Sequence, residues 1–280
     1  MMKILVTGAS GMLGQDVMRV LQEQKHTCLG VSSADFDLTD TAAVLAAAKA
    51  FQPHAIIHCA AYTAVDLAES EPVRCCSVNG LGSLNIARAA LAVKAKLLYV
   101  STDYVFDGSG NAPWEAADRP RPLNIYGLSK LQGEEAVQAL VRQHFVLRTS
   151  WVFGHGGSNF VETIRRLGRE KSQISVVEDQ IGSPTYTVDL ARLIAQIIVT
   201  DRYGVYHATN EGFCSFADFA RVILRADGSR CRVVPIPSSQ YPSAARRPLN
   251  SRLSKASLDE NDFPRLPIWE DALRRYIVGD

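Results

Sequence analysis

Three glycines near the start of the chain constrain its fold more than any other feature. Gly8, Gly11 and Gly14 lie between a short apolar run at 3–7 and a stretch of helical character at 15–24. Glycines here permit a tight turn and let a diphosphate approach backbone N–H groups, and the last one lets the helix pack closely on the strand. The pattern therefore favours a strand–turn–helix unit that binds a dinucleotide.

Strand-like and helix-like segments alternate through the first half of the chain. Short apolar runs recur at 27–31, 55–59, 96–100 and from 145 onward, with helical patterns between them. Alternation of this kind predicts an α/β fold with a Rossmann-like, doubly wound parallel sheet. We assign residues 1–152 to this dinucleotide-binding domain.

The pattern changes after residue 153, where amphipathic helices, short strands and proline-rich loops follow. We expect a smaller α/β C-terminal substrate lobe made of residues 153–177, 203–227 and 257–280. About 178–202 and part of 228–256 are expected to return to the first domain.

Composition excludes several classes of protein. The chain has 280 residues, a net charge of +1 and 47% hydrophobic residues. This favours a globular enzyme-sized fold over a nucleic-acid or membrane-surface partner. No apolar run reaches the roughly 18 residues of a membrane span, and the N-terminus lacks a signal-peptide pattern. The six cysteines show no Cys-x-x-Cys spacing, so we expect reduced thiols, no zinc site and a cytoplasmic location.

A second informative stretch lies between residues 101 and 135. Thr102 follows an apolar run and is expected at the carboxyl end of a strand, where open α/β sheets bind ligands. Tyr126 and Lys130 are four apart in a region with helical character at 128–141, and therefore share a face. We expect the ammonium to lower the phenol pKa from about 10 and make a proton donor. Such a pair alone is common on surface helices, but the glycine loop and the Ser-Thr pair favour a catalytic role.

The end of the second predicted strand leaves the choice of cofactor open. An acid often binds the ribose 2′-hydroxyl of NAD at this point, whereas Ser32 and Ser33 stand here. The sequence therefore fits NADH and NADPH equally. Asp37 either caps the following segment or contacts the adenine, and turn formation is the more general role of such a residue.

Other polar residues support structural and functional interpretations alike. Asp66, Glu69 and Glu71 form an acidic segment that we expect to be solvated. Asn79 either faces the site or points to solvent. Arg246 and its neighbour Arg247 suit a diphosphate as well as a solvated basic turn.

Together these motifs resemble the dTDP-4-dehydrorhamnose reductase family of the extended short-chain dehydrogenase/reductase superfamily. The glycine loop and Tyr-x-x-x-Lys are signals of the superfamily, and the other blocks are more specific. The matching blocks are Ser101-Thr102-Asp103-Tyr104-Val105-Phe106-Asp107-Gly108, Tyr126-Gly-x-Ser-Lys130, Arg148-Thr149-Ser150-Trp151, Asp179-Gln180-x-Gly182-x-Pro184-Thr185 and Arg247-Pro248-x-Asn250-Ser251. The resemblance extends from the glycine loop to about residue 253.

The resemblance implies NADH- or NADPH-dependent reduction of the C4 ketone of a dTDP-linked 6-deoxy-4-keto-L-hexose, the last step of dTDP-L-rhamnose synthesis. Tyr126 would protonate the nascent alkoxide, Lys130 would hold the nicotinamide ribose, and Thr102 would orient the carbonyl. The residues that would line the cofactor are Gly8, Gly11, Met12, Leu13, Gly14, Asp37, Leu38, Ala61, Tyr62 and Thr63. The residues that would meet the substrate are Val65, Thr102, Asp103, Trp151, Arg247 and Asn250.

Two alternatives remain at this stage. The protein is a reductase of another nucleotide-linked 4-ketosugar, or a non-catalytic dinucleotide-binding subunit similar to the regulatory subunit of methionine adenosyltransferase. The complete set of Thr102, Tyr126 and Lys130 favours the enzyme, because a binding module needs no proton donor.

Some members of the family bind Mg²⁺ between subunits through glutamates. At the first such position Asp16 follows Gly14-Gln15, and the second falls near Val188, with Asp189 next to it. One residue along a helix turns a side chain by about 100°, and Mg²⁺ tolerates misplaced ligands poorly. We therefore expect no metal and a monomer or weak homodimer.

Overall fold

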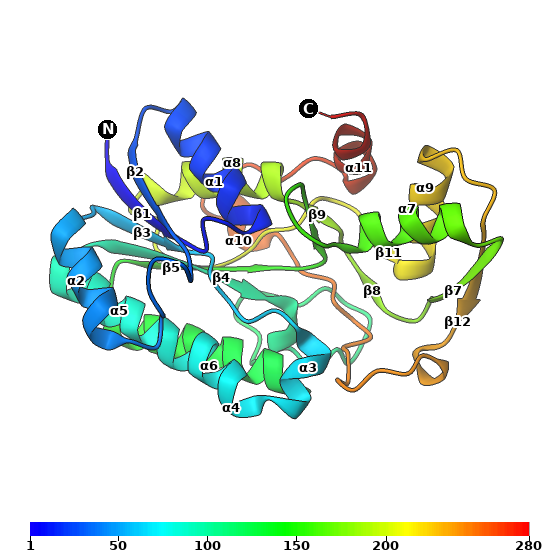
Figure 1. Cartoon of the computed structure of the whole chain (residues 1–280), viewed down its shortest axis with the longest axis horizontal. Helices are drawn as coiled ribbons and strands as arrows, with labels where there is room; N and C mark the ends of the chain where they lie inside the picture. The colour runs from blue at the N-terminus through cyan, green and yellow to red at the C-terminus, as the bar shows by residue number, and fades with distance from the viewer. Residues whose placement is uncertain (280) are drawn as a thin grey trace.

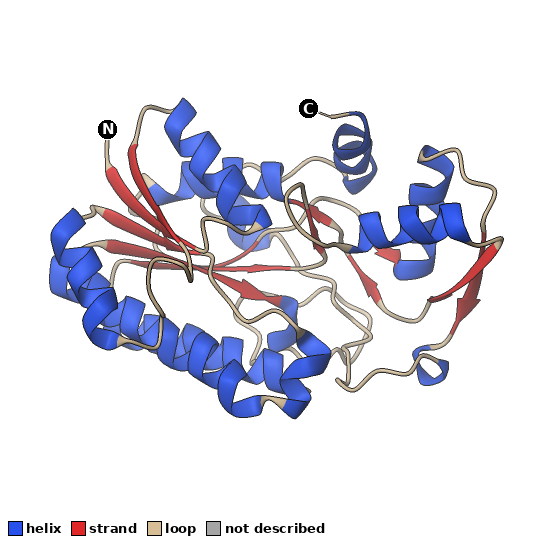
Figure 2. Ribbon diagram, viewed as in Figure 1, coloured by secondary structure: helices blue, strands red, loops and turns tan. Residues whose placement is uncertain are grey.

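The computed structural model describes residues 1–279, and within them the main architectural feature is a six-stranded parallel sheet (Figures 1 and 2). Its strands lie in the order β10-β5-β4-β3-β1-β2. The strands are β1 (Lys3–Thr7), β2 (Thr27–Val31), β3 (Ala55–His58), β4 (Lys96–Thr102), β5 (His144–Thr149) and β10 (Gly204–His207). The predicted doubly wound α/β fold is confirmed.

Helices cover both faces of this sheet (Figure 1). One face packs against α1 (Met12–Glu23) and α8 (Thr187–Ile198), and the other against α2 (Thr41–Phe51), α5 (Gly82–Val93) and α6 (Ile125–Leu140). Burial on both faces explains why the central strands are continuous apolar runs rather than alternating ones. Neighbouring strand residues enter different cores, since Ile4 packs with the first helix pair and Leu5 with the other three helices.

Short elements follow β3 and β4 at the carboxyl end of the sheet. They are α3 (Val65–Ser70), α4 (Pro72–Cys76), the π-helical turn η1 (Ser77–Leu81) and, after β4, the 3₁₀ turn η2 (Asp103–Val105). α4, η1 and α5 follow one another directly, and a π-helical turn inside a helical run frequently marks a functional site.

A second lobe with its own core lies beside the carboxyl ends of the main strands (Figure 1). Its elements are β6 (Val152–Phe153), α7 (Phe160–Glu170), β7 (Gln173–Val177), β8 (Ile181–Gly182), β9 (Thr185–Tyr186), β11 (Cys214–Ser215), α9 (Phe216–Ala226), β12 (Arg232–Ile236), η3 (Ser238–Gln240) and α11 (Trp269–Val278). Its strands form three two-stranded sheets, β12-β7, β11-β8 and β6-β9. A capping box between Ser215 and Asp218 starts α9.

Two segments that we expected in the smaller lobe belong to the main core instead. Strand β10 extends the large sheet by pairing with β5, because its Tyr206 buries its ring against that sheet. The short helix α10 (Ala256–Asp259) contacts β10, and Leu258, Phe263 and Leu266 join the same core. The lobe boundary at residue 203 was therefore wrong, and residues 257–266 pack with the main sheet rather than with α11.

Across residues 1–279 the structure contains no helix that is both long and apolar enough to cross a membrane.

Candidate active site

The main cleft opens at the carboxyl ends of the central strands and has a volume of about 1440 Å³. Loops after β1 to β5 form one wall, and α7, β7 and Phe216 contribute the other. Most of the predicted site residues line it: Gly8, Gly11, Met12, Leu13, Gly14, Asp37, Leu38, Ala61, Thr63, Val65, Thr102, Asp103, Tyr126, Lys130, Trp151 and Arg247. Tyr62 and Asn250 are not among the lining residues.

The glycine loop has the form that a dinucleotide diphosphate requires. Gly8 has a φ of +69°, and a Cβ there would lie 2.7 Å from the backbone nitrogen of Ala60. A Cβ on Gly14 would overlap the carbonyl oxygen of Gly8, so helix and turn are in direct contact. Helix α1 begins after Gly11 without a side-chain cap. Its first-turn N–H groups and the positive end of its dipole therefore fit an anionic ligand.

The turn after β2 contains Asp35, an acid that the sequence analysis did not single out. Asp35 accepts hydrogen bonds from the backbone nitrogen of Ser32 at 2.7 Å and from its hydroxyl at 3.0 Å. These bonds hold the pKa of the Asp35 carboxyl below its ordinary value. Asp37 instead accepts from the backbone nitrogen of Thr39, the turn-forming role. The turn contains no lysine or arginine.

Asn79 joins the cofactor wall to the catalytic helix and does not point to solvent. Its buried side chain accepts from the nitrogen of Tyr62 at 2.7 Å and donates to the Tyr62 carbonyl at 3.0 Å. It also donates to the hydroxyl of Ser129 on α6 at 2.9 Å. The phenol of Tyr62 donates to Glu71 at 2.9 Å. The Tyr62 side chain is thus engaged outside the cleft.

Thr102, Tyr126 and Lys130 meet at the end of β4. Lys130 is buried, donates from Nζ to the carbonyl of Val100 at 2.8 Å, and lies 4.1 Å from the ring centroid of Tyr99. Desolvation lowers the pKa of Lys130 to about 7. Tyr126 is half-buried and hydrogen-bonded to Thr102. Two hydroxyl groups therefore face the same part of the cleft, one turn of helix away from the lysine.

The expected lowering of the Tyr126 pKa is not what the structure shows. Burial raises the pKa of the phenol above its ordinary value, and the hydrogen bond from Thr102 acts in the opposite direction. The reason is that Lys130 directs its ammonium to Val100 and Tyr99. Tyr126 is therefore held as a neutral phenol, the protonated form that a proton donor needs.

Asp103 is buried beside Thr102 with one oxygen unpartnered. Thr102 donates to its Oδ1 at 3.1 Å, while its Oδ2 has no hydrogen-bond partner. Desolvation raises the pKa of Asp103 to about 7, against hydrogen bonds from Ser251 and Thr102. Buried polar atoms in native proteins are nearly always paired, and Asp103 belongs to the residues that line the cleft, so a ligand hydroxyl is a candidate partner for this oxygen.

Trp151 forms the junction between the two lobes. Its φ of +47° is unusual for a bulky residue, and strain of this kind clusters at functional sites. The indole stacks on Phe216 with ring centroids 3.6 Å apart. The predicted substrate residue therefore presents a rigid aromatic wall to the cleft.

Of the two C-terminal residues predicted at the substrate, one reaches the cleft. Arg247 lines it while pairing with Asp66 at 2.7 Å. The buried Asn250 instead donates to the carbonyl of Ala112 at 2.8 Å and accepts from the guanidinium of Arg252 at 3.0 Å. The geometry thus gives Asn250 the role of fixing the 109–112 loop.

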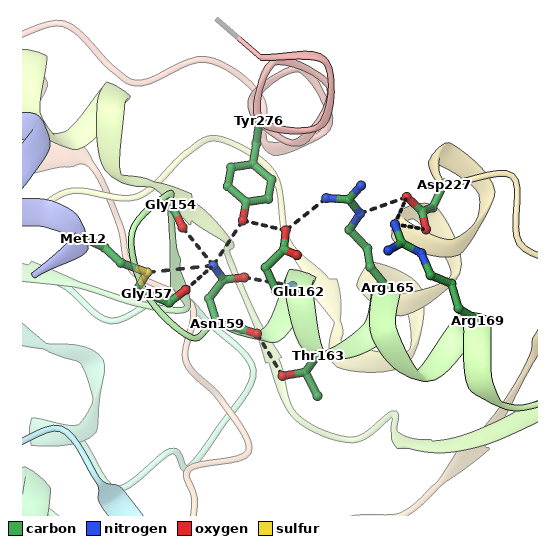
Figure 3. Close-up of polar contacts among 10 residues, drawn as sticks. All are labelled: Met12, Gly154, Gly157, Asn159, Glu162, Thr163, Arg165, Arg169, Asp227 and Tyr276. Carbon is green, nitrogen blue, oxygen red and sulfur yellow. Dashed lines mark hydrogen bonds and ion pairs between the residues drawn. The ribbon is translucent and has the colours of Figure 1, made fainter.

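A glycine-containing loop, residues 154–158, lies against the start of α1 (Figure 3). Asn159 anchors it by donating to the Gly154 carbonyl at 2.9 Å and by capping α7 through the nitrogen of Glu162 at 3.1 Å. Tyr276 of α11 donates to the same Glu162 at 2.8 Å. A Cβ on Gly157 would lie 2.7 Å from the Met12 side chain. The sequence indicated a site-side loop after residue 154 but named none of its residues as site residues, because its glycines resemble an ordinary turn.

Asp16 and Asp189, which stand at or next to the two positions where the family resemblance implied metal ligands, both form ion pairs. Asp189 is buried and accepts from Arg275 at 2.6 Å and from Asn210 at 2.8 Å, while Asp16 pairs with Arg19 at 3.1 Å. Residues 1–279 hold no cluster of three or more His, Cys, Asp or Glu side chains suited to a metal ion. The six cysteines are free thiols.

Comparison with known proteins agrees with this geometry. The family model described as the RmlD substrate binding domain matches residues 2–279. The spore coat polysaccharide biosynthesis protein SpsK of Bacillus subtilis is 37% identical over 277 residues, covering 99% of this chain and 97% of its own. The dTDP-4-dehydrorhamnose reductase of Mycolicibacterium smegmatis is 41% identical, covering 99% of this chain and 85% of its own.

Solved structures agree as well. The dTDP-4-dehydrorhamnose reductase of Bacillus anthracis in complex with NADP superposes with a TM-score of 0.97 at 40% identity, covering 100% of this chain and 99% of its own. Whole-length similarity in both sequence and structure leads to one assignment. The chain belongs to the dTDP-4-dehydrorhamnose reductase family.

Proposed function

We propose that the protein reduces the C4 ketone of dTDP-4-dehydro-L-rhamnose to give dTDP-L-rhamnose, with Tyr126 as the proton donor and NADH or NADPH as the reductant. The observation that carries the proposal is the convergence of Thr102, Tyr126 and Lys130 in the same cleft as the glycine loop. A regulatory dinucleotide-binding subunit would have no use for two hydroxyl groups beside a buried lysine.

The residues have separate roles in this proposal. The nicotinamide supplies the hydride that C4 accepts. Tyr126 transfers its phenolic proton to the C4 oxygen, and Thr102 hydrogen-bonds the same oxygen and fixes its direction. Lys130, buried one helical turn from Tyr126 and held by the carbonyl of Val100, would position the nicotinamide ribose. The product is the C4 alcohol, with one hydride and one proton added.

Substrate groups match the remaining walls of the cleft. The unpartnered oxygen of Asp103 suits a sugar hydroxyl, the indole of Trp151 suits the sugar face, and the guanidinium of Arg247 suits the diphosphate. Gly11, Met12 and Leu13 would hold the cofactor diphosphate at the start of α1.

Absorbance of the reduced nicotinamide tests the proposal directly. Purified protein is mixed with NADH or NADPH and a panel of 4-keto sugar nucleotides that differ in base and in sugar stereochemistry. We expect oxidation that is fastest with dTDP-4-dehydro-L-rhamnose. Faster turnover of another member would identify a different ketosugar reductase. Absence of oxidation with every member would contradict the proposal and favour the regulatory subunit.

A further inference from the structure

The short helix α3 carries two carboxylates that bind other segments, although we expected them to be solvated. Asp66 accepts from both terminal nitrogens of Arg247, at 2.7 and 3.1 Å. The same carboxylate accepts from the hydroxyl of Ser243 at 2.9 Å and from the nitrogen of Ala245 at 3.1 Å. One side chain thereby fixes the course of residues 243–247, which we call the arginine loop.

Glu69, one turn further along α3, reaches the catalytic helix. Its Oε1 accepts from the backbone nitrogen of Ile125 at 2.8 Å. Ile125 is the first residue of α6 and the neighbour of Tyr126, and a helix leaves its first N–H groups without internal partners. Glu69 therefore helps to set where the helix that carries the proton donor begins.

Asn124 links the arginine loop directly to the same helix start. Its Oδ1 caps α6 by accepting from the nitrogen of Gly127 at 2.8 Å. Its Nδ2 donates to the carbonyl of Arg246 at 2.8 Å. The three segments, α3, the start of α6 and the arginine loop, are thus joined pairwise into a closed triangle.

A second connection runs inside this triangle. Tyr104 is hydrogen-bonded to Arg247, and its ring meets that of Tyr126 edge-on with centroids 5.7 Å apart. Arg247 also lines the cleft. A guanidinium has five N–H donors, so pairing with Asp66 does not exhaust its capacity for an anion.

We propose that this triangle couples a nucleoside diphosphate bound at Arg247 to the placement of Tyr126, with Asp66, Glu69 and Asn124 as positioning residues. The inference rests on the proposed function, because it takes Arg247 as the diphosphate contact. A bound diphosphate orders the arginine loop, and the loop cannot move without Asn124 and α3. Binding at the remote end of the substrate thereby lowers the barrier at the sugar, as expected when distant contacts orient the reacting groups.

Asn124→Asp breaks the loop connection while it keeps the cap of α6. Aspartate keeps the acceptor that caps α6 and removes the amide that donates to Arg246. Amide hydrogen exchange is followed in a peptide that spans the start of α6, with and without saturating dTDP. In the unmodified protein we expect dTDP to slow this exchange. In the variant we expect the slowing to be lost, dTDP affinity to stay within about threefold, and kcat to fall about tenfold.

Two pairs of variants separate coupling from stability. Glu69→Gln keeps the acceptor for Ile125 and should retain kcat, whereas Glu69→Ala removes it and should lower kcat. Asp66→Asn should raise KM and lower kcat together. Glu135→Gln, an exposed acid on α6, is the charge control and should change neither. A merely structural role would change exchange equally with and without dTDP.

The outcomes also separate this inference from the proposed function. If the unmodified protein binds dTDP and reduces the ketosugar, but Asn124→Asp keeps both the dTDP-dependent slowing and its kcat, the coupling is wrong and the function stands. If the unmodified protein binds no dTDP, the proposed function is wrong and the coupling is overturned with it.

Discussion

Tyr126 is the residue on which the proposed chemistry depends. Replacing it by Phe removes the phenol proton and keeps the ring that meets Tyr104. We expect kcat to fall by a factor on the order of 10²–10⁴, the usual contribution of a positioned proton donor. Cofactor affinity, measured by fluorescence titration, should change little. Near-normal turnover of the Phe variant would show that the proton comes from another group.

Asp103 gives the folded protein a distinct pH dependence. Burial raises its pKa to about 7, whereas an unfolded chain has a value of about 3.9. Between these pH values the folded state holds a proton that the unfolded state has released, so this group makes the free energy of unfolding fall as pH rises. An amide side chain cannot titrate, so the variant Asp103→Asn should gain stability relative to the unmodified protein between about pH 4 and pH 7.

Denaturant unfolding of both proteins at several pH values measures this difference. Three pKa units correspond to at most about 4 kcal/mol, reached above pH 7. Hydrogen bonds lost in the variant change its free energy of unfolding by the same amount at every pH, so they do not affect how the difference between the two proteins changes with pH. A stability difference that is the same at pH 4.5 and pH 8 would show that Asp103 titrates normally in the folded protein.

The sequence predicted residue types better than it predicted residue environments. Thr102, Tyr126 and Lys130 were identifiable because chain spacing places them at a strand end and on one helix face. The raised pKa of Tyr126 was not predictable, because it arises from the burial of the phenol in the folded protein, whereas Lys130 directs its ammonium to Val100. The role of Asp66 was missed for the same reason, since its partner Arg247 is 181 residues away.

At the scale of elements, we expect the turn after β2 to govern the choice between NADH and NADPH. It offers no cation to a 2′-phosphate, and Asp35 already occupies the N–H and hydroxyl of Ser32. Serine hydroxyls nevertheless can hydrogen-bond either the free 2′-hydroxyl of NADH or the 2′-phosphate of NADPH. We expect kcat/KM for NADH and NADPH to agree within roughly tenfold, which is ~1.4 kcal/mol.

Asp35→Asn should shift that ratio towards NADPH, because it removes a negative charge that binds Ser32 in the turn after β2. Asp40→Asn is a matched control, because Asp40 is an exposed acid that caps α2. Titration with NAD⁺ and NADP⁺ in the absence of sugar gives a readout independent of turnover. A preference near a thousandfold in the unmodified protein would place the discriminating residue elsewhere in the cleft.

Elements near the N-terminus were predicted more accurately than later ones, for a physical reason. Strands β1, β3 and β4 lie inside the sheet and are buried on both faces, so each leaves a continuous apolar signature. Strand β10 is short, lies at the sheet edge and follows a long excursion into the other lobe. Its sequence, Gly-Val-Tyr-His, does not indicate which sheet it will join.

At the scale of the whole molecule, an ion pair joins the two lobes near the second position at which the family resemblance implied a possible metal ligand. Asp189 of α8 pairs with Arg275 of α11 and with Asn210, and its side chain is 3% exposed. A metal there would have to displace the guanidinium of Arg275, whose side chain is 20% exposed, from this buried carboxylate. Asp16 is committed to Arg19.

We therefore expect activity that does not depend on magnesium and a protein that is a monomer or a weak dimer. Static light scattering across a concentration series, with and without EDTA, measures the assembly, and a parallel assay with each cofactor measures turnover. EDTA should not lower turnover, and Mg²⁺ added after EDTA should therefore not raise it. Mg²⁺ prefers near-octahedral oxygen ligands, whereas Asp16 and Asp189 each form an ion pair with an arginine. A stable dimer that dissociates and loses activity in EDTA would contradict this expectation and would require the Asp189–Arg275 pair to open on assembly.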